Sequence, residues 1–131
     1  MTGLQGAAAI NLNTVEFKAF VPARDFVQSK AFYEALGFII PWSDNDLAYV
    51  RHGDCAFLLQ NFHEPAHTAN FQMHMLVENV DDWHRHVVAS GVAERFGVKV
   101  GPCEDQPWAM RDFVLFDPSG VLWRIAQNLP R

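Results

Sequence analysis

Apolar and polar side chains alternate along two long stretches of the chain, which is the pattern of half-buried β-strands. In residues 106–128, QPWAMRDFVLFDPSGVLWRIAQN, the alternation stops at Asp117-Pro118-Ser119-Gly120 and resumes after it. Proline at the second position and glycine at the fourth are typical of a tight turn, so this stretch predicts a β-hairpin. Residues 47–61, LAYVRHGDCAFLLQN, alternate in the same way around His52-Gly53-Asp54. One predicted hairpin therefore occurs twice.

The segments in front of the two hairpins also match each other. Asp25 and Asn79 stand where helix N-caps belong, and Gly37 and Gly91 stand where left-handed residues end helices. In the first half we expect a strand at 15–21, a helix from Asp25 to Gly37 and a strand at 38–42. In the second half we expect a strand at 71–77, a helix from Asn79 to Gly91 and a strand at 93–100. The pattern predicts an α+β fold of two βαβββ modules, because each half repeats the same order.

The predicted module boundaries are about 14–61 and 70–128, within one domain spanning residues 1–131. A polar connector at about 62–69, within the segment FHEPAHTAN of residues 62–70, links the modules. Residues 1–12 are expected to form a loose N-terminal tail. A chain of 131 residues that is 50% hydrophobic suits one compact domain with a sizeable core.

Composition excludes several classes of function. The formal charge is −5 and the ten basic residues are scattered, which argues against nucleic-acid binding. No apolar run approaches the roughly 20 residues of a membrane span, so no membrane partner is expected. The tail has no basic start or long apolar core, which favours the cytoplasm over export. Cys55 and Cys103 are more often free thiols than a disulfide in such a chain, although pairing stays open.

Two motifs carry a resemblance to a known family. Asp-x-x-x-Ser-x-x-Phe-Tyr-x-x-Leu-Gly-Phe starts at Asp25, and Pro-Trp-x-x-Arg-Asp-Phe followed by Asp-Pro-x-Gly starts at Pro107. Together, in this order over about residues 15–128, they resemble the glyoxalase, bleomycin-resistance and extradiol-dioxygenase (vicinal oxygen chelate) superfamily, and within it the small bleomycin-resistance proteins. The resemblance implies a strongly curved mixed sheet around a cleft. It also implies a homodimer with two ligand crevices at the subunit boundary.

The resemblance locates the metal ligands of the catalytic relatives, which hold a divalent ion with one residue from each of four strands. Those positions carry Lys18, Gln60, Gln72 and Arg124 in this chain. Lys and Arg have no free lone pair at neutral pH and repel a divalent ion, so no metal, no cofactor and no catalytic residue are expected.

A catalytic alternative stays open. A shift of two residues along a strand keeps the same face and would bring in Glu16 and His74 beside Gln60. These residues and a water would hold one divalent metal ion in a lyase, transferase or dioxygenase of the same superfamily. Whether the protein is an enzyme is therefore undecided, with the balance against it.

By the resemblance, Trp42 and Trp108 fall on the two positions whose rings sandwich the planar bithiazole of bleomycin. Indole faces stack on heteroaromatic rings and attract cations. Acidic residues flank both tryptophans, at Asp44 and Asp46 and at Glu104 and Asp105. The combination favours a planar, cationic ligand, while core or dimer-interface roles for the two indoles remain the alternative.

Four further residues are candidate ligand contacts. Gln60 offers an amide to a ligand or to the backbone, and Phe57 forms a wall of either the core or the cleft. Arg124 points inward and needs an anion, either Glu16 or a ligand carboxylate or phosphate, and His74 lines the cleft or the core. The leading hypothesis is a protein that sequesters a planar, cationic antibiotic of the bleomycin type in a dimer-interface cleft, without chemical change.

Overall fold

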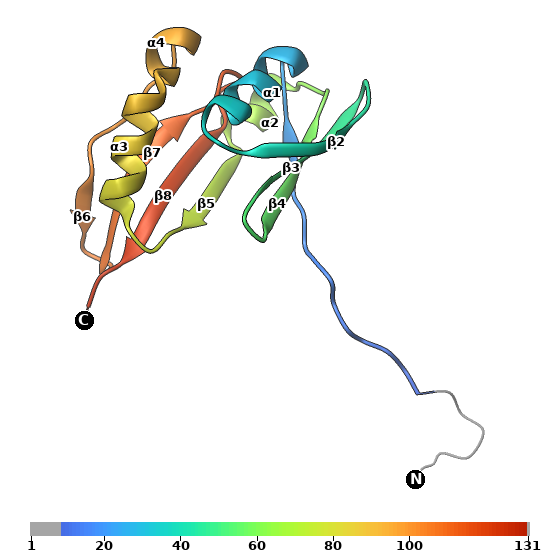
Figure 1. The fold of residues 1–131 in the computed structure, drawn as a ribbon, viewed down its shortest axis with the longest axis horizontal. Helices are drawn as coiled ribbons and strands as arrows, with labels where there is room; N and C mark the ends of the chain where they lie inside the picture. Colours follow the sequence, from blue (N-terminus) through green and yellow to red (C-terminus); the bar gives the residue numbers. More distant parts are fainter. Residues whose placement is uncertain (1–8, 131) are drawn as a thin grey trace.

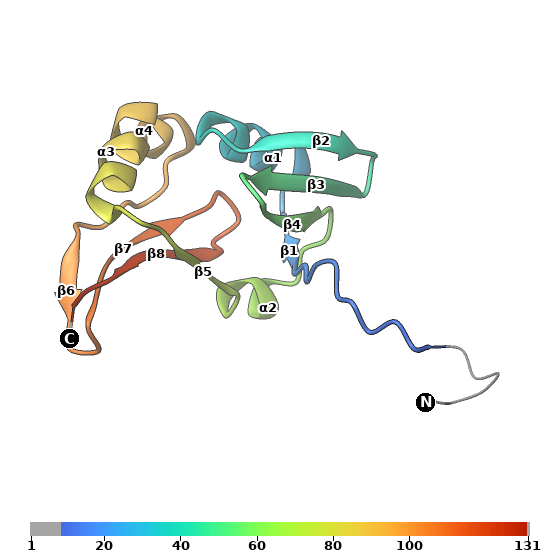
Figure 2. The ribbon, with the colours of Figure 1, turned by 60° about the horizontal axis from the view of Figure 1, so that its bottom comes forward.

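Two four-stranded mixed sheets make up the fold, one from each half of the chain, as Figure 1 and Figure 2 show. The computed structural model describes residues 9–130. The first half contains β1 (Phe20–Pro22), α1 (Phe26–Ala35), β2 (Ile39–Ser43), β3 (Leu47–His52) and β4 (Cys55–Gln60), followed by α2 (Pro65–Ala69). The second half contains β5 (Gln72–Leu76), α3 (Val80–Ser90), α4 (Val92–Phe96), β6 (Glu104–Gln106), β7 (Met110–Phe116) and β8 (Leu122–Asn128).

The two sheets have the same topology. Their strand orders are β1-β4-β3-β2 and β5-β8-β7-β6, so in each half the first strand pairs in parallel with the last. The other neighbours are antiparallel, and both predicted hairpins are present as β3–β4 and β7–β8. The α+β fold of two repeated modules is therefore confirmed.

The two long helices begin and end where the sequence predicts. Asp25 caps α1 by accepting the backbone N–H of Gln28 at 3.0 Å, and Asn79 caps α3 by accepting that of Asp82 at 3.0 Å. Gly37 and Gly91 follow these helices with φ of 97° and 74°, a conformation that glycine adopts without a Cβ clash. Within residues 9–130, no helix combines the length and apolar character needed to cross a membrane.

A shared core joins the two sheets. One face of each sheet is buried under the helices, and the Trp123 ring of β8 lies 5.3 Å from that of Phe57 in β4 and 6.0 Å from that of Phe38. Residues that alternate with the core residues lie on the other face of each sheet. We call these the first open face, which carries Leu47, Tyr49, Arg51, Leu58 and Gln60, and the second open face, which carries His74, Asp112, Val114, Leu122 and Arg124.

The prediction of a strand over residues 15–21 is wrong, since β1 spans only Phe20–Pro22. The carbonyl oxygen of Ala19 still accepts the amide of Leu58 at 3.0 Å, but residues 15–18 have no strand partner within residues 9–130. Residues 9–18 extend away from the two sheets (Figure 2), and the Phe17 side chain is 91% exposed. We call residues 9–18 the arm.

The predicted strand over residues 93–100 is also wrong. Val92–Phe96 form the short helix α4, which ends at Gly97 with φ 66°, and only Val100 makes an isolated bridge, to Leu115. The second strand of this module is instead β6, three polar residues that alternation could not indicate. The connector expected at 62–69 likewise contains a helix, α2, capped by Glu64.

Candidate functional site

A pocket of about 220 Å³ lies on the second open face, beside the β6–β7 hairpin. Trp108, Gln106, Asp112 and Arg124 line it, together with residues of the loop 101–104. Trp108 belongs to the turn between β6 and β7, and its side chain is 52% exposed. This pocket offers a flat indole surface beside charged groups.

The turn that carries Trp108 has an unusual backbone. Ala109 adopts φ 61°, the left-handed conformation that costs a residue with a Cβ about 1 kcal/mol. Its N–H donates to the carbonyl of Gln106 at 3.2 Å, and its carbonyl accepts the N–H of Leu129 at 2.9 Å. These two bonds hold Trp108 between β6 and the C-terminal end of the chain.

Asp112 organises the floor of this pocket. Its side chain is 2% exposed, and one carboxylate oxygen accepts the Arg124 guanidinium at 3.0 Å. The other oxygen accepts the Gln106 amide at 3.0 Å. A buried carboxylate needs such partners, because an unpaired buried charge is strongly unfavourable. Arg124 therefore pairs with Asp112, which corrects the expectation of a pair with Glu16.

Sequence reasoning considered Asp112 as a partner of Arg111 or as a rim residue, and it did not identify the pairing of Asp112 with Gln106 and Arg124. The period-2 pattern around Phe113 does place Asp112 on the open face, but nothing in it shows that the residue is buried. That burial follows from the register, which sets Val114 opposite Arg124 and Gln106 opposite Met110. The burial of Asp112 therefore depends on how β6, β7 and β8 pair, which the local sequence around Asp112 does not show.

Arg111 belongs to a separate ion-pair network at the edge of the sheet. Its guanidinium donates to Asp81 at 3.1 Å and to Asp105 at 2.9 Å, and these carboxylates raise the pKa of the Arg111 side chain. Hydrogen bonds from Arg111 in turn lower the pKa of Asp81. Of the acids flanking Trp108, Asp105 is thus neutralised by a neighbour.

The first open face carries Trp42, which is 50% exposed in β2 and lies opposite Tyr49 in β3. The Tyr49 hydroxyl donates to Glu16 of the arm at 3.2 Å, and Lys18 binds Glu16 at 2.9 Å. The hydrogen bond from Lys18 lowers the pKa of Glu16. Gln60 is half-buried at the end of β4, and its backbone carbonyl accepts the N–H of Ala23 at 2.9 Å.

Apart from Phe57, the predicted ligand contacts divide between the two sheets. Trp42 and Gln60 belong to the first sheet, whereas Trp108, Arg124 and His74 belong to the second, where His74 of β5 is the cross-strand neighbour of Arg124. Within one chain, β2 and β6 lie at opposite ends of the molecule in Figure 1 and in Figure 2. One chain therefore does not bring the two indoles together.

Phe57 is a core residue. Its ring is 3% exposed and lies 5.0 Å from the ring of Tyr33 and 5.3 Å from that of Trp123. Burial on the helix-covered side of β4 separates it from the first open face. We therefore assign Phe57 to the core, which corrects the expectation that it contacts a ligand.

No metal-binding cluster of three His, Cys, Asp or Glu residues forms within the described part of the chain. The alternative ligands also lie apart, since Glu16 contacts Tyr49 of the first sheet and His74 lies on β5 of the second. At two of the positions that the resemblance assigns to metal ligands, Lys18 is bound to Glu16, and Arg124 is bound to Asp112. Gln72 lies on β5 opposite Leu122, and Gln60 on β4 opposite Leu47.

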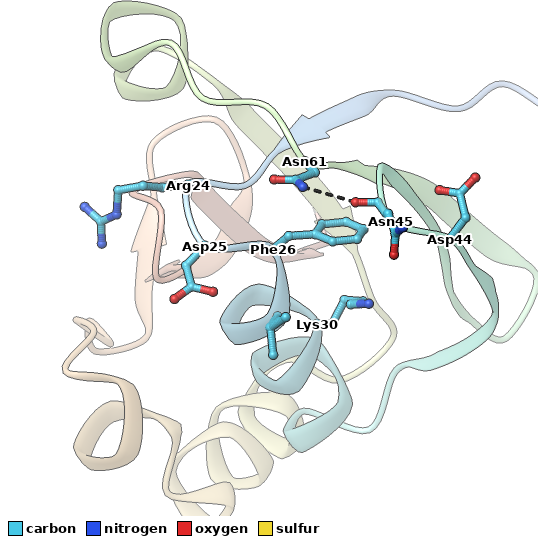
Figure 3. Close-up of a pocket in the computed structure, with 8 residues that line it drawn as sticks. Arg24, Asp25, Phe26, Lys30, Asp44, Asn45 and Asn61 are labelled. Atoms are coloured by element: carbon cyan, nitrogen blue, oxygen red, sulfur yellow. Dashed lines mark hydrogen bonds between the residues drawn. The ribbon is translucent and has the colours of Figure 1, made fainter.

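A larger cavity, of about 560 Å³, lies beside the start of α1 (Figure 3). The Lys30 ammonium group lies 4.5 Å from the centre of the Phe26 ring, and the Asn61 amide donates to the carbonyl of Asn45 at 3.1 Å. Asp44 accepts the backbone N–H groups of Asp46 and Leu47, which lower the pKa of its carboxyl group. The polar side chains here already have partners within the protein, so we place the candidate site on the open faces instead.

Two βαβββ modules, each with one buried and one open sheet face, define the fold class of this chain. The chain belongs to the Glyoxalase/Bleomycin resistance protein/Dioxygenase superfamily, whose sequence profile matches residues 12–125. It is 29% identical to a bleomycin resistance protein of Klebsiella pneumoniae over 113 residues, which are 82% of this chain and 88% of that one.

Two solved structures show the same architecture. A bleomycin resistance determinant encoded on transposon Tn5 matches with a TM-score of 0.72 and 25% identity, over 88% of this chain and 98% of that one. A bleomycin-binding protein complexed with bleomycin matches with a TM-score of 0.76 and 27% identity, over 88% of this chain and 99% of that one. The resemblance found in the sequence motifs is therefore confirmed.

Proposed function

We propose that this protein binds a planar, cationic small molecule of the bleomycin type and sequesters it without chemical change. The observation that carries the proposal is the pair of half-exposed indoles, Trp42 and Trp108, one on each sheet of a chain similar to a bleomycin-binding protein. An indole face provides a stiff apolar surface for a heteroaromatic ring, and its π-electrons attract a positive charge.

The proposed site lies between two subunits of a homodimer. A site that uses both indoles requires a second chain, because β2 and β6 lie far apart within one chain (Figure 1). The first open face of one subunit would then meet the second open face of its partner, and the dimer would hold two crevices. Exposed apolar side chains support association, because isolated chains rarely leave so many uncovered: Ile10, Leu12, Val15, Phe17, Phe20, Ile39 and Leu76.

Binding without turnover suits the groups at the open faces. Lys18 and Arg124 have no lone pair for a metal ion at neutral pH, and both are held by carboxylates. Cys55 and Cys103 are free thiols, which suits the reducing cytoplasm as the place of action. Resistance would follow from stoichiometric removal of the free drug, which requires affinity alone.

Titration with bleomycin, followed by tryptophan fluorescence and calorimetry, tests the proposal. We expect saturable binding at one ligand per chain, weakened by about tenfold or more in Trp108→Ala, since base-like stacking on an aromatic face contributes about 1–3 kcal/mol. Trp83→Phe is the control, because Trp83 lies on α3, where its ring meets that of His52 edge-on with the ring centres 5.0 Å apart. Equal affinity in the two variants would contradict the stacking role.

Analysis of the bound drug separates sequestration from catalysis. Bleomycin recovered from the complex after long incubation should keep its mass and its activity against DNA. A stoichiometric divalent ion retained by the protein through chelation, or a chemically altered drug, would instead support the metal-dependent alternative.

A further inference from the structure

The guanidinium group of Arg124 is only partly used by the protein. Its Nη1 atom donates to Asp112 at 3.0 Å, whereas its Nε and Nη2 atoms have no hydrogen-bonding partner among residues 9–130. The side chain is half-buried and lines the same pocket as Trp108. Arginine carries five N–H donors in a fixed planar fork, so this one presents unused donors to the pocket.

The guanidinium group of Arg111, the residue before Asp112 in β7, differs from that of Arg124 because it is fully bound. All three of its guanidinium nitrogens donate to carboxylates, with Nε and Nη2 bound to Asp81 and Nη1 bound to Asp105. Two carboxylates therefore saturate Arg111, and a single one holds Arg124. The unsaturated arginine is the one that lies beside the half-exposed indole.

Asp112 and Gln106 fix the position of the Arg124 guanidinium group. Asp112 is buried and is itself held by the Gln106 amide at 3.0 Å, so the carboxylate has little freedom to release or rotate the guanidinium. Asp112 and Gln106 are thus positioning residues. His74, the cross-strand neighbour of Arg124 on β5, adds a second nitrogen donor on the same face of the sheet.

We propose that Arg124 recognises a carboxylate attached to the planar ring that stacks on Trp108. The inference rests on the proposed function and specifies its ligand class, a heteroaromatic carboxylate. A planar fork matches a carboxylate with two parallel hydrogen bonds, and such charge-assisted bonds are about twice as strong as neutral ones. We take the anionic group to be joined directly to the stacked ring, because Trp108 and Arg124 line one pocket of only about 220 Å³. A cationic substituent would lie toward the exposed Glu104 at the rim.

Two matched probes test this proposal: 2-phenylthiazole-4-carboxylate and the uncharged 2-phenylthiazole-4-carboxamide. Their affinities for the full chain are measured by calorimetry and tryptophan fluorescence. Wild type should prefer the carboxylate by about tenfold, a value typical of a charge-assisted bond. The preference should fall in Arg124→Lys, which keeps the charge and loses the fork, and disappear in Arg124→Gln. Arg111→Gln, the matched control, should keep it.

The ratio of the two affinities separates recognition from folding. Arg124→Gln leaves Asp112 buried without its cation, so the double variant Arg124→Gln with Asp112→Asn restores a neutral pair and should also lack the preference. A wild-type protein without preference, or an Arg124→Gln variant that keeps it, overturns the proposal.

The outcomes also distinguish this proposal from the function on which it rests. If bleomycin binds in a Trp108-dependent manner but the wild-type protein shows no preference for the carboxylate probe over the carboxamide probe, only the role of Arg124 is wrong. If bleomycin and both probes all fail to bind, the ligand class and the proposed function fall together.

Discussion

Tyr33 in α1 donates its hydroxyl hydrogen to Asp117 at 2.7 Å, and this buried bond joins the two halves of the chain. Asp117 begins the β7–β8 turn, where its other oxygen accepts the backbone N–H groups of Ser119 and Val121, each at 2.9 Å. The indole nitrogen of Trp123 donates to the Tyr33 hydroxyl at 2.9 Å. The β7–β8 turn of the second module is therefore attached to the first helix of the other module.

Replacing Tyr33 by Phe should lower the free energy of unfolding by about 1.5–3 kcal/mol, because a buried carboxylate and a buried indole N–H each lose a partner. Urea denaturation measures the change. Tyr49→Phe is the control, since that hydroxyl meets Glu16 of the arm at the surface, and its effect should be much smaller. Similar losses in the two variants would show that the Tyr33 hydroxyl does not stabilise the junction.

Asp117 should make stability depend on pH. Burial is the main cause that raises the pKa of its carboxyl group above the ordinary 3.8. The folded state then binds the proton more tightly than the unfolded state, so the contribution of Asp117 is full below pH 3.8 and is lost as the pH rises through the raised pKa. Compared with Asp117→Asn, which does not titrate, wild type should lose stability across this window. Urea midpoints that change in parallel at every pH would contradict the shift.

The turn at Ala109 should tolerate glycine and reject a branched side chain. At φ 61°, Ala109→Val places a β-branched residue in the left-handed region, and we expect a loss of about 1–2 kcal/mol. Ala109→Gly removes the Cβ clash, and the greater freedom of glycine in the unfolded chain offsets part of that gain. Thermal unfolding measures both. Ala89→Val, at an exposed position of α3, should cost about 0.5 kcal/mol.

Mixing two inactive variants tests the subunit arrangement. Trp42→Ala and Trp108→Ala should each bind bleomycin weakly, because every crevice of either homodimer lacks one indole. After subunit exchange, half of the dimers are mixed and each contains one intact crevice, so about a quarter of the wild-type binding capacity should return. A site built within one chain would show no recovery, and neither would a monomer.

The arm should matter for association and little for the fold of one chain. Phe17 is 91% exposed, so Phe17→Ser should leave the urea midpoint of the dissociated chain unchanged. The same change should weaken dimerisation, as measured by sedimentation equilibrium, if the partner covers the arm. Val27→Ser is the control, because Val27 is also exposed and lies on α1, away from the arm. Equal dissociation constants for the two variants would exclude the arm from the interface.

Features with a local physical cause could be read from the chain alone. The Asp25 and Asn79 caps, the glycine stops and the Asp117 turn depend on residues within a few positions of each other. Such contacts form in almost any tertiary context, so their residue types are informative. The repeat of the hairpin then indicated two similar modules, which the strand orders confirm.

Features that depend on distant segments needed the tertiary structure. Alternation divides β4 into two faces, but only the packing against Trp123 decides that Phe57 belongs to the core. Likewise, Arg124 finds Asp112 because β7 and β8 pair in a particular register, and Glu16 is removed from it by the position of the arm. The spacing of apolar residues and the helix-capping residues specify which helices and strands form, because these interactions act over a few residues. Which face is covered, and which charge meets which, is decided by the burial of surfaces that the chain brings together only when it folds.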